Sequence, residues 1–162
     1  MKLPYRSAVA SLLLCTSFAA SAGPATTKPL EISGVLQELV GPSLRCASKF
    51  GGTIIGHGTS AQVGPVAFLG TDCITPSGSL FNFSEGRITI IMGTAEQIFA
   101  NYSGQFVPTG EGTKFTFNNA TFQITGGTGR YKHASGGGSF TGGEDMATGA
   151  GTIKLKGQIT TK

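Results

Sequence analysis

Residues 114–142 read KFTFNNATFQITGGTGRYKHASGGGSFTG, and this stretch decides the fold class. Its first half alternates polar with apolar side chains at residues 114–117 and again at 121–124, which is the period of a β-strand with one buried face. Its second half is rich in glycine, which permits positive φ angles and close crossings of the chain. We expect strands over residues 114–125 and 137–142, with one helical turn around Tyr131 and Ala134 that plugs the end of a barrel.

The remainder of the chain shows the same organisation on both sides of this stretch. Short apolar and β-branched runs recur between clusters of Gly, Pro, Asn and Ser, and no segment has helical periodicity of useful length. Nine short segments in all indicate an antiparallel all-β protein. The further strands are expected at residues 30–38, 48–56, 62–70, 80–83, 87–92, 96–107 and 151–160.

Glycines occur inside these segments as well as between them, and glycine within a strand marks a bulge or a tight bend. Such corners favour a closed barrel over an open sandwich. The expected fold is a single antiparallel closed β-barrel of about eight strands, wide enough to be filled by side chains or to hold one small ligand. Eleven phenylalanines can fill it, so a plain core is the first interpretation of the interior and a hydrophobic pocket the second.

The N-terminus has the pattern of a signal peptide. Lys2 and Arg6 precede an apolar run over residues 8–20, and small residues then lead to a cleavage site between Ala22 and Gly23. The apolar run is shorter than the roughly 20 residues that a membrane-spanning helix needs. We expect a secreted or periplasmic protein without a stable membrane anchor.

Cleavage leaves a chain of one domain, residues 23–162, with two cysteines. In an oxidising compartment Cys46 and Cys73 pair without remainder, so a structural disulfide is expected. Ten basic residues then stand against eight acidic ones, a net charge of +2. The basic residues are scattered, whereas nucleic-acid binding proteins gather theirs in a dense patch, so no nucleic-acid partner is expected.

No catalytic motif is present, and the candidate site residues are therefore individual polar side chains. Glu85 and Glu96 lie at the edges of apolar strands; pointing into a barrel, either would have a raised pKa and suit general acid or base work. The alternative is a solvated carboxylate at a strand end. Asn101 and Tyr102 would add polar contacts to such a pocket.

Glu144 and Asp145 lie beside glycines, where they suit either a calcium-binding turn or a plain exposed turn. Because the neighbouring sequence lacks the spacing of calcium-binding repeats, the exposed turn is the expectation. No metal and no cofactor are predicted.

The glycine-rich stretch also carries a resemblance. Ile124-Thr125-Gly126-Gly127-Thr128-Gly129, followed by Tyr131, Ala134 and a glycine-rich strand through Phe140, is similar to a segment of the allene oxide cyclase-like barrels, which are related to the dirigent proteins. Gly56-His57-Gly58-Thr59 and Gly70-Thr71-Asp72-Cys73 are similar to segments of bacterial exported members. Plant cyclases act on a reactive epoxide inside the barrel, and dirigent proteins bind phenolic radicals in a similar pocket. Their functional residues do not align with this chain, so the resemblance implies the fold and not the activity.

Three functions remain open. The first is a non-catalytic envelope or extracellular binding or structural module, with a small apolar ligand as one case. The second is a cyclase- or dirigent-like protein that guides a reactive small molecule, which requires a hollow barrel with a buried polar residue. The third is a surface module that recognises a protein or a glycan. Assembly into a homo-oligomer is compatible with all three.

Overall fold

The computed structural model describes residues 24–162, so the predicted leader and its cleavage site at Ala22 and Gly23 lie outside the described residues. Within the described range the protein is all-β, with eight strands and one short 3₁₀-helix. The elements are β1 (Thr26–Pro42), β2 (Phe50–Ser60), β3 (Gly64–Ser77), β4 (Leu80–Met92), β5 (Gln97–Pro108), β6 (Lys114–Gly127), η1 (Gly129–Tyr131), β7 (Ser135–Asp145) and β8 (Ala150–Thr161).

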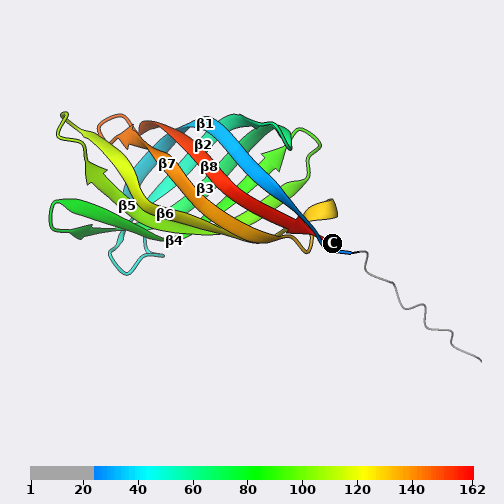
Figure 1. Ribbon diagram of the computed structural model, residues 1–162. Coiled ribbons are helices and arrows are strands. Elements are labelled where there is room, and N and C mark those ends of the chain that lie inside the picture. Colours follow the sequence, from blue (N-terminus) through cyan, green and yellow to red (C-terminus); the bar gives the residue numbers. More distant parts are fainter. Residues whose placement is uncertain (1–23) are drawn as a thin grey trace, which may run out of the picture.

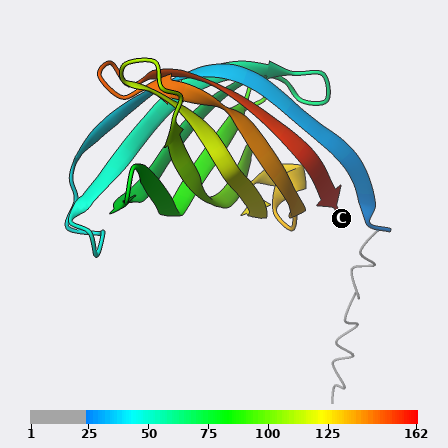
Figure 2. The ribbon, with the colours of Figure 1, turned by 60° about the vertical axis from the view of Figure 1, so that its left-hand side comes forward.

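The strands form one closed antiparallel barrel. Each strand pairs with the next along the chain, and β1 pairs with β8 to close the ring (Figures 1 and 2). The predicted fold class is thereby confirmed. Closure gives every strand a hydrogen-bonded neighbour on both sides, so this barrel presents no free strand edge.

The connections divide the barrel into two different ends (Figure 1). One end, here called the loop end, holds the β1–β2, β3–β4, β5–β6 and β7–β8 connections. The opposite end, here called the helix end, holds η1, the start of β1 and the end of β8. Tyr131 and Ala134 are both buried there, which confirms the predicted helical turn at the end of the barrel.

One expectation about the strands is wrong. Residues 80–83 and 87–92 belong to the single strand β4, which carries a register shift against β5 between Phe83 and Gly86. Glu85 has a φ angle of 51° at this point, as expected where an extra residue bulges from a strand. Beyond the bulge the strand alternates regularly, with buried side chains at residues 88, 90 and 92.

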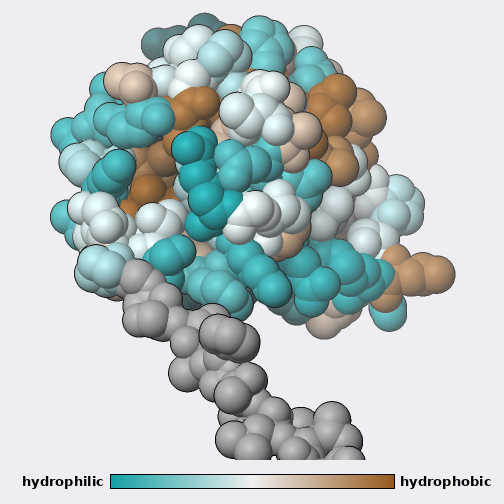
Figure 3. All heavy atoms as spheres, turned by 90° about the vertical axis from the view of Figure 1, so that its right-hand side faces the viewer, coloured by the Kyte–Doolittle hydropathy of each residue, from teal (hydrophilic) through white to brown (hydrophobic). Residues whose placement is uncertain are grey.

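The core fills the barrel along its whole length, and its composition differs between the two halves. Aliphatic side chains such as Leu30, Ile32 and Ile98 are buried toward the helix end. Toward the loop end the rings of Phe83, Phe106, Phe117 and Phe140 pack on one another with centroids 4.7 to 6.1 Å apart. From outside, the helix end is mainly hydrophilic, with apolar side chains in separate patches (Figure 3).

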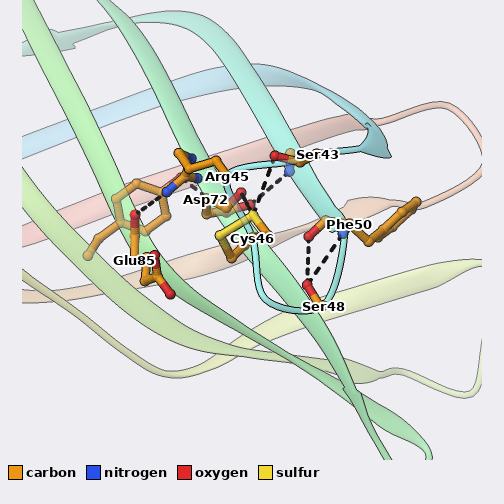
Figure 4. Close-up of a disulfide and its surroundings, with 10 residues drawn as sticks. Ser43, Arg45, Cys46, Ser48, Phe50, Asp72 and Glu85 are labelled. Atoms are coloured by element: carbon orange, nitrogen blue, oxygen red, sulfur yellow. Dashed lines mark hydrogen bonds between the residues drawn. A yellow bond between two sulfur atoms is a disulfide. The ribbon is translucent and has the colours of Figure 1, made fainter.

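Cys46 and Cys73 form a disulfide, as predicted. The bond ties the β1–β2 loop, residues 43–49, to the outside of β3 near the loop end (Figure 4). No helix in the described part of the chain is both long enough and apolar enough to span a bilayer.

Candidate functional site

Three carboxyl groups lie inside the aromatic half of the barrel. Glu38 on β1, Asp72 on β3 and Glu144 on β7 are each at most 5% exposed. They point inward because side chains alternate along a strand, and each continues the buried series of its own strand, as Glu38 follows Leu36. We refer to these three residues as the acid cluster.

Asp72 is the best satisfied member of the acid cluster. The backbone amide of Gly52 donates to its Oδ1 at 3.1 Å, and the Tyr102 hydroxyl donates to its Oδ2 at 3.1 Å. Burial raises the pKa of Asp72, while these two hydrogen bonds and the positive charge of Arg45 act in the opposite direction. Burial likewise raises the pKa of Tyr102, which therefore stays a hydrogen-bond donor at physiological pH.

Glu38 and Glu144 are less well satisfied. Within residues 24–162, Glu38 Oε1 and Glu144 Oε2 are buried without a hydrogen-bond partner. Burial, and next the nearby charges of Asp72 and Glu144, raise the pKa of Glu38 to about 10. Burial also raises the pKa of Glu144, to about 7.

The two groups also affect each other in opposite directions, because Glu144 raises the pKa of Glu38 whereas Glu38 lowers that of Glu144. Glu38 is therefore the member that holds the proton. At neutral pH the pair combines a carboxylic acid, which can donate a hydrogen bond, with a neighbour that exchanges its own proton near neutrality.

The disulfide-tethered loop places a positive charge near this cluster. Arg45 lies one residue before Cys46, and its Nη1 donates to the backbone carbonyl of Glu85 at 3.1 Å, which links the loop to the bulge of β4. Figure 4 shows Arg45, Cys46 and Asp72 gathered where the loop crosses β3. Because Cys73 directly follows Asp72, the disulfide fixes the loop beside the acid cluster.

A small cavity lies among the acid cluster, Tyr102 and the aromatic side chains, with a volume of about 40 Å³. A water molecule needs roughly 10 to 15 Å³ on the same measure, so the cavity has room for a few waters. Pockets for drug-sized ligands usually measure about 300 to 1,000 Å³. The interior is thus mostly filled, and an organic ligand has to displace side chains to enter.

The structure places the four predicted site residues in different surroundings. Glu85 is exposed at the β4 bulge, and Asn101 is exposed on the outer face of β5. Glu96 lies in the β4–β5 connection at the helix end, where its Oε2 pairs with Arg130 Nε at 3.1 Å and its Oε1 accepts from the Arg130 amide at 3.0 Å. Only Tyr102 points into the interior and joins the acid cluster.

The acid cluster itself was not predicted, and the expectation for Glu144 is wrong. It does not lie in an exposed turn, because β7 extends through Asp145 and Glu144 faces the core. Each of the three acids lies an even number of residues from buried apolar or glycine positions on its own strand. This period-2 pattern could have predicted that all three face the interior. No three His, Cys, Asp or Glu side chains among residues 24–162 are arranged to hold a metal ion.

Comparison with known proteins gives no assignment for this site, since no protein-family model and no curated protein matches the chain.

Proposed function

We propose that the protein is an exported barrel that binds a small, mainly apolar molecule in its aromatic half, with the acid cluster hydrogen-bonded to a polar group of that molecule. The observation that carries this proposal is the pair of unpartnered carboxyl oxygens on Glu38 and Glu144, buried among phenylalanines. A buried polar atom without a partner is costly, and a ligand that supplies the partner removes this cost.

The acid cluster is difficult to explain as core packing. Replacing buried ionisable groups by apolar side chains of similar size is often neutral or stabilising, so a purely structural barrel gains little from three of them. They also lie together, on β1, β3 and β7, although these strands are not hydrogen-bonded to one another. Such convergence of polar groups in an apolar interior is typical of ligand-binding sites.

The small cavity sets a condition on binding. Phe81, Phe115 and Phe117 are only partly buried and pack against the core at the loop end. We infer that rotation of these side chains opens the interior, because the helix end is filled by Tyr131. The ligand needs an apolar body that replaces one or two rings and an oxygen that accepts a hydrogen bond from protonated Glu38.

The export part of the proposal rests on two observations. The first 22 residues have the pattern of a signal peptide, and the disulfide suits an oxidising compartment. We accordingly propose a secreted or periplasmic location.

The proposal is tested by native mass spectrometry of the protein purified from its own source and by titration with the fluorescent apolar probe 1-N-phenylnaphthylamine. Phe117→Ala enlarges the interior and is expected to increase probe binding. Glu38→Gln keeps the size of the side chain but removes the carboxylic acid, and it is expected to alter retention of the natural ligand. Glu31→Gln is the matched control, since Glu31 lies on the same strand but faces outward and pairs with Lys156. A protein that carries no ligand, and whose Phe117→Ala variant binds no probe, would contradict the proposal.

A second function is favoured by the unequal proton affinities of Glu38 and Glu144. A protonated acid beside a group that titrates near pH 7 is an acid–base pair, which suits isomerisation or cyclisation of a reactive small molecule. A reactive, mainly apolar epoxide is the substrate class to test first, with the stereochemistry of the product as the measurement. Loss of stereochemical control in Glu38→Gln, but not in Glu31→Gln, would support catalysis over binding.

A further inference from the structure

A second concave surface lies on the outside of the barrel, remote from the interior. It is an open groove of about 650 Å³ across the outer faces of β4, β5, β6 and β7. Each of β4, β5 and β6 contributes two polar residues that lie two positions apart along the strand, so all six side chains face outward. They are Glu85, Arg87, Asn101, Ser103, Thr121 and Gln123.

The strand register arranges these residues in rows. Arg87 pairs with Asn101, Asn101 with Gln123, and Gln123 with Gly137, so one row runs across four strands. A second row lies beside it, in which Ser103 pairs with Thr121. With about 4.8 Å between neighbouring strands, the first row is roughly 14 Å long, which is the scale of a short oligosaccharide.

The polar side chains of the groove are free to bind. All six are exposed, and none of them makes a hydrogen bond or ion pair to another side chain or to the backbone within residues 24–162. The one contact at this place is through the main chain of Glu85, whose carbonyl accepts from Arg45. Elsewhere on the outer surface, Thr27 and Thr160 bond to each other.

Glycine shapes the β7 side of the groove. Gly136 has a φ angle of 131°, and a Cβ placed there would overlap the carbonyl oxygen of Gln158 on β8. A Cβ at Gly137 would overlap the carbonyl oxygen of Phe122 on β6. The chain therefore needs glycine at both positions, and the surface beside Gln123 stays low and open as a result.

The chemistry of the groove selects a neutral, hydroxyl-rich ligand. Its two charged groups, Glu85 and Arg87, cancel, which disfavours a strongly anionic or cationic partner. The two amides and two hydroxyls each offer a donor and an acceptor, which matches sugar hydroxyls that also do both. Phe99 lies two residues before Asn101 on the same face and is 36% exposed, so an aromatic ring flanks the row where the apolar face of a sugar can pack.

We propose that this groove is a binding site for a neutral glycan. The proposal is independent of ligand binding inside the barrel, because the groove residues lie on the opposite face of the sheet from the acid cluster. A peptide is the less suitable occupant, since peptides that bind to sheets usually add to a free edge strand and this barrel has none.

The test is an NMR titration of the ¹⁵N-labelled protein, expressed with its own leader, with neutral hexasaccharides of glucose, mannose and N-acetylglucosamine. At least one sugar is expected to shift the amide signals of Asn101, Gln123 and Gly137 selectively. The double variant Asn101→Ala/Gln123→Ala is expected to weaken that binding about tenfold or more. His57→Ala is the control, because His57 is exposed on the outer face of β2, away from the groove.

Three results would overturn the proposal. One is the absence of shifts with every sugar at millimolar concentration. Another is a set of shifts that lies outside the groove or persists in the double variant. The third is a groove whose signals respond to a mixture of casein peptides or to raised protein concentration but to no sugar, which would make it a protein-recognition surface. Because both substituted side chains are exposed, the double variant is expected to keep the wild-type melting temperature, and this is measured alongside.

Discussion

The carboxyl group of Glu38 occupies the space that a side chain at Gly52 would fill. A Cβ built on Gly52 would overlap Glu38 Oε1 and would lie 2.9 Å from Asp72 Oδ1. The amide of the same glycine donates to Asp72, so one residue of β2 both admits one acid and binds another. The acid cluster thus depends on a position without a side chain as much as on the acids themselves.

Substituting Gly52→Ala is therefore expected to destabilise the protein by about 2 kcal/mol, the usual cost of overpacking a core. Combining it with Glu38→Ala should recover much of this loss, because the overlapping carboxyl group is then gone. Urea denaturation of the single and double variants measures the coupling. Gly41→Ala is the control, since nothing lies within 4 Å of a Cβ at Gly41. Strictly additive effects at positions 38 and 52 would contradict the geometry.

The stability of the protein should fall as pH rises. The pKa of Glu38 is raised from 4.5 to about 10 and that of Glu144 from 4.5 to about 7. Above pH 4.5 the folded chain therefore keeps protons that the unfolded chain has released, and the free energy of unfolding falls as pH rises. The stabilising contribution of these two groups is fully present below pH 4.5. Both groups contribute to its loss between about pH 4.5 and 7, and Glu38 continues to contribute toward pH 10, each with a slope of up to about 1.4 kcal/mol per pH unit.

The measurement is the free energy of unfolding in urea at intervals from pH 5 to pH 9. Glu38→Gln should flatten the dependence, whereas the outward-facing Glu31→Gln should leave it unchanged. A wild-type protein that becomes more stable over this range would show that the acid cluster is ionised in the folded state.

Removing the hydroxyl group of Tyr102 tests its hydrogen bond to Asp72. Tyr102→Phe leaves Asp72 Oδ2 buried without its donor, at an expected cost of about 1 to 3 kcal/mol. In Asp72→Asn/Tyr102→Phe the cost of losing the hydroxyl should be smaller, because a neutral amide is cheaper to bury than a carboxylate. Thermal unfolding of the four proteins gives the comparison, and equal losses in both backgrounds would argue against the hydrogen bond.

The disulfide should contribute substantially to stability. It joins residues 27 apart in the sequence, and the loop-closure estimate for such a link is about 3.5 kcal/mol. Cys46→Ser/Cys73→Ser is expected to lose about this amount in guanidinium denaturation. It should also free Arg45 from Glu85, so hydrogen exchange in residues 43–49 should become faster. Unchanged exchange in that loop would show that the disulfide does not hold it in place.

The sequence predicted the barrel and the disulfide but only one member of the site, and the reason lies in where strands end. Residues 30–38, 62–70 and 137–142 were expected as strands, whereas β1, β3 and β7 continue to Pro42, Ser77 and Asp145. Glu38 therefore appeared at a strand end, and Asp72 and Glu144 appeared beyond one. The polar residue at each of these positions suggests that the strand ends there. The strand continues beyond it because it pairs with its neighbours in the barrel, and the local sequence does not show this pairing.

Tyr102 was found because it lies in the middle of the strand expected at residues 96–107, where the end of the strand is not in question. Glu85 and Glu96 failed to reach the interior for a related reason. Glu85 is the residue that the β4 bulge turns outward, and Glu96 precedes the first residue of β5. The inward or outward direction of a side chain beside a bulge depends on the partner strand, which the local sequence does not contain.

The pairing of β1 with β8 also governs when this protein can fold. The two strands that close the ring are the first and last of the barrel, so the ring stays open until the residues of β8 have been made. The Cys46–Cys73 bond joins the β1–β2 loop to β3, within the first half of the chain, and can form much earlier. Oxidation before closure would thus commit the N-terminal strands to their mutual register, and a chain truncated before Ala150 would remain an open sheet with two unpaired edges, prone to aggregation.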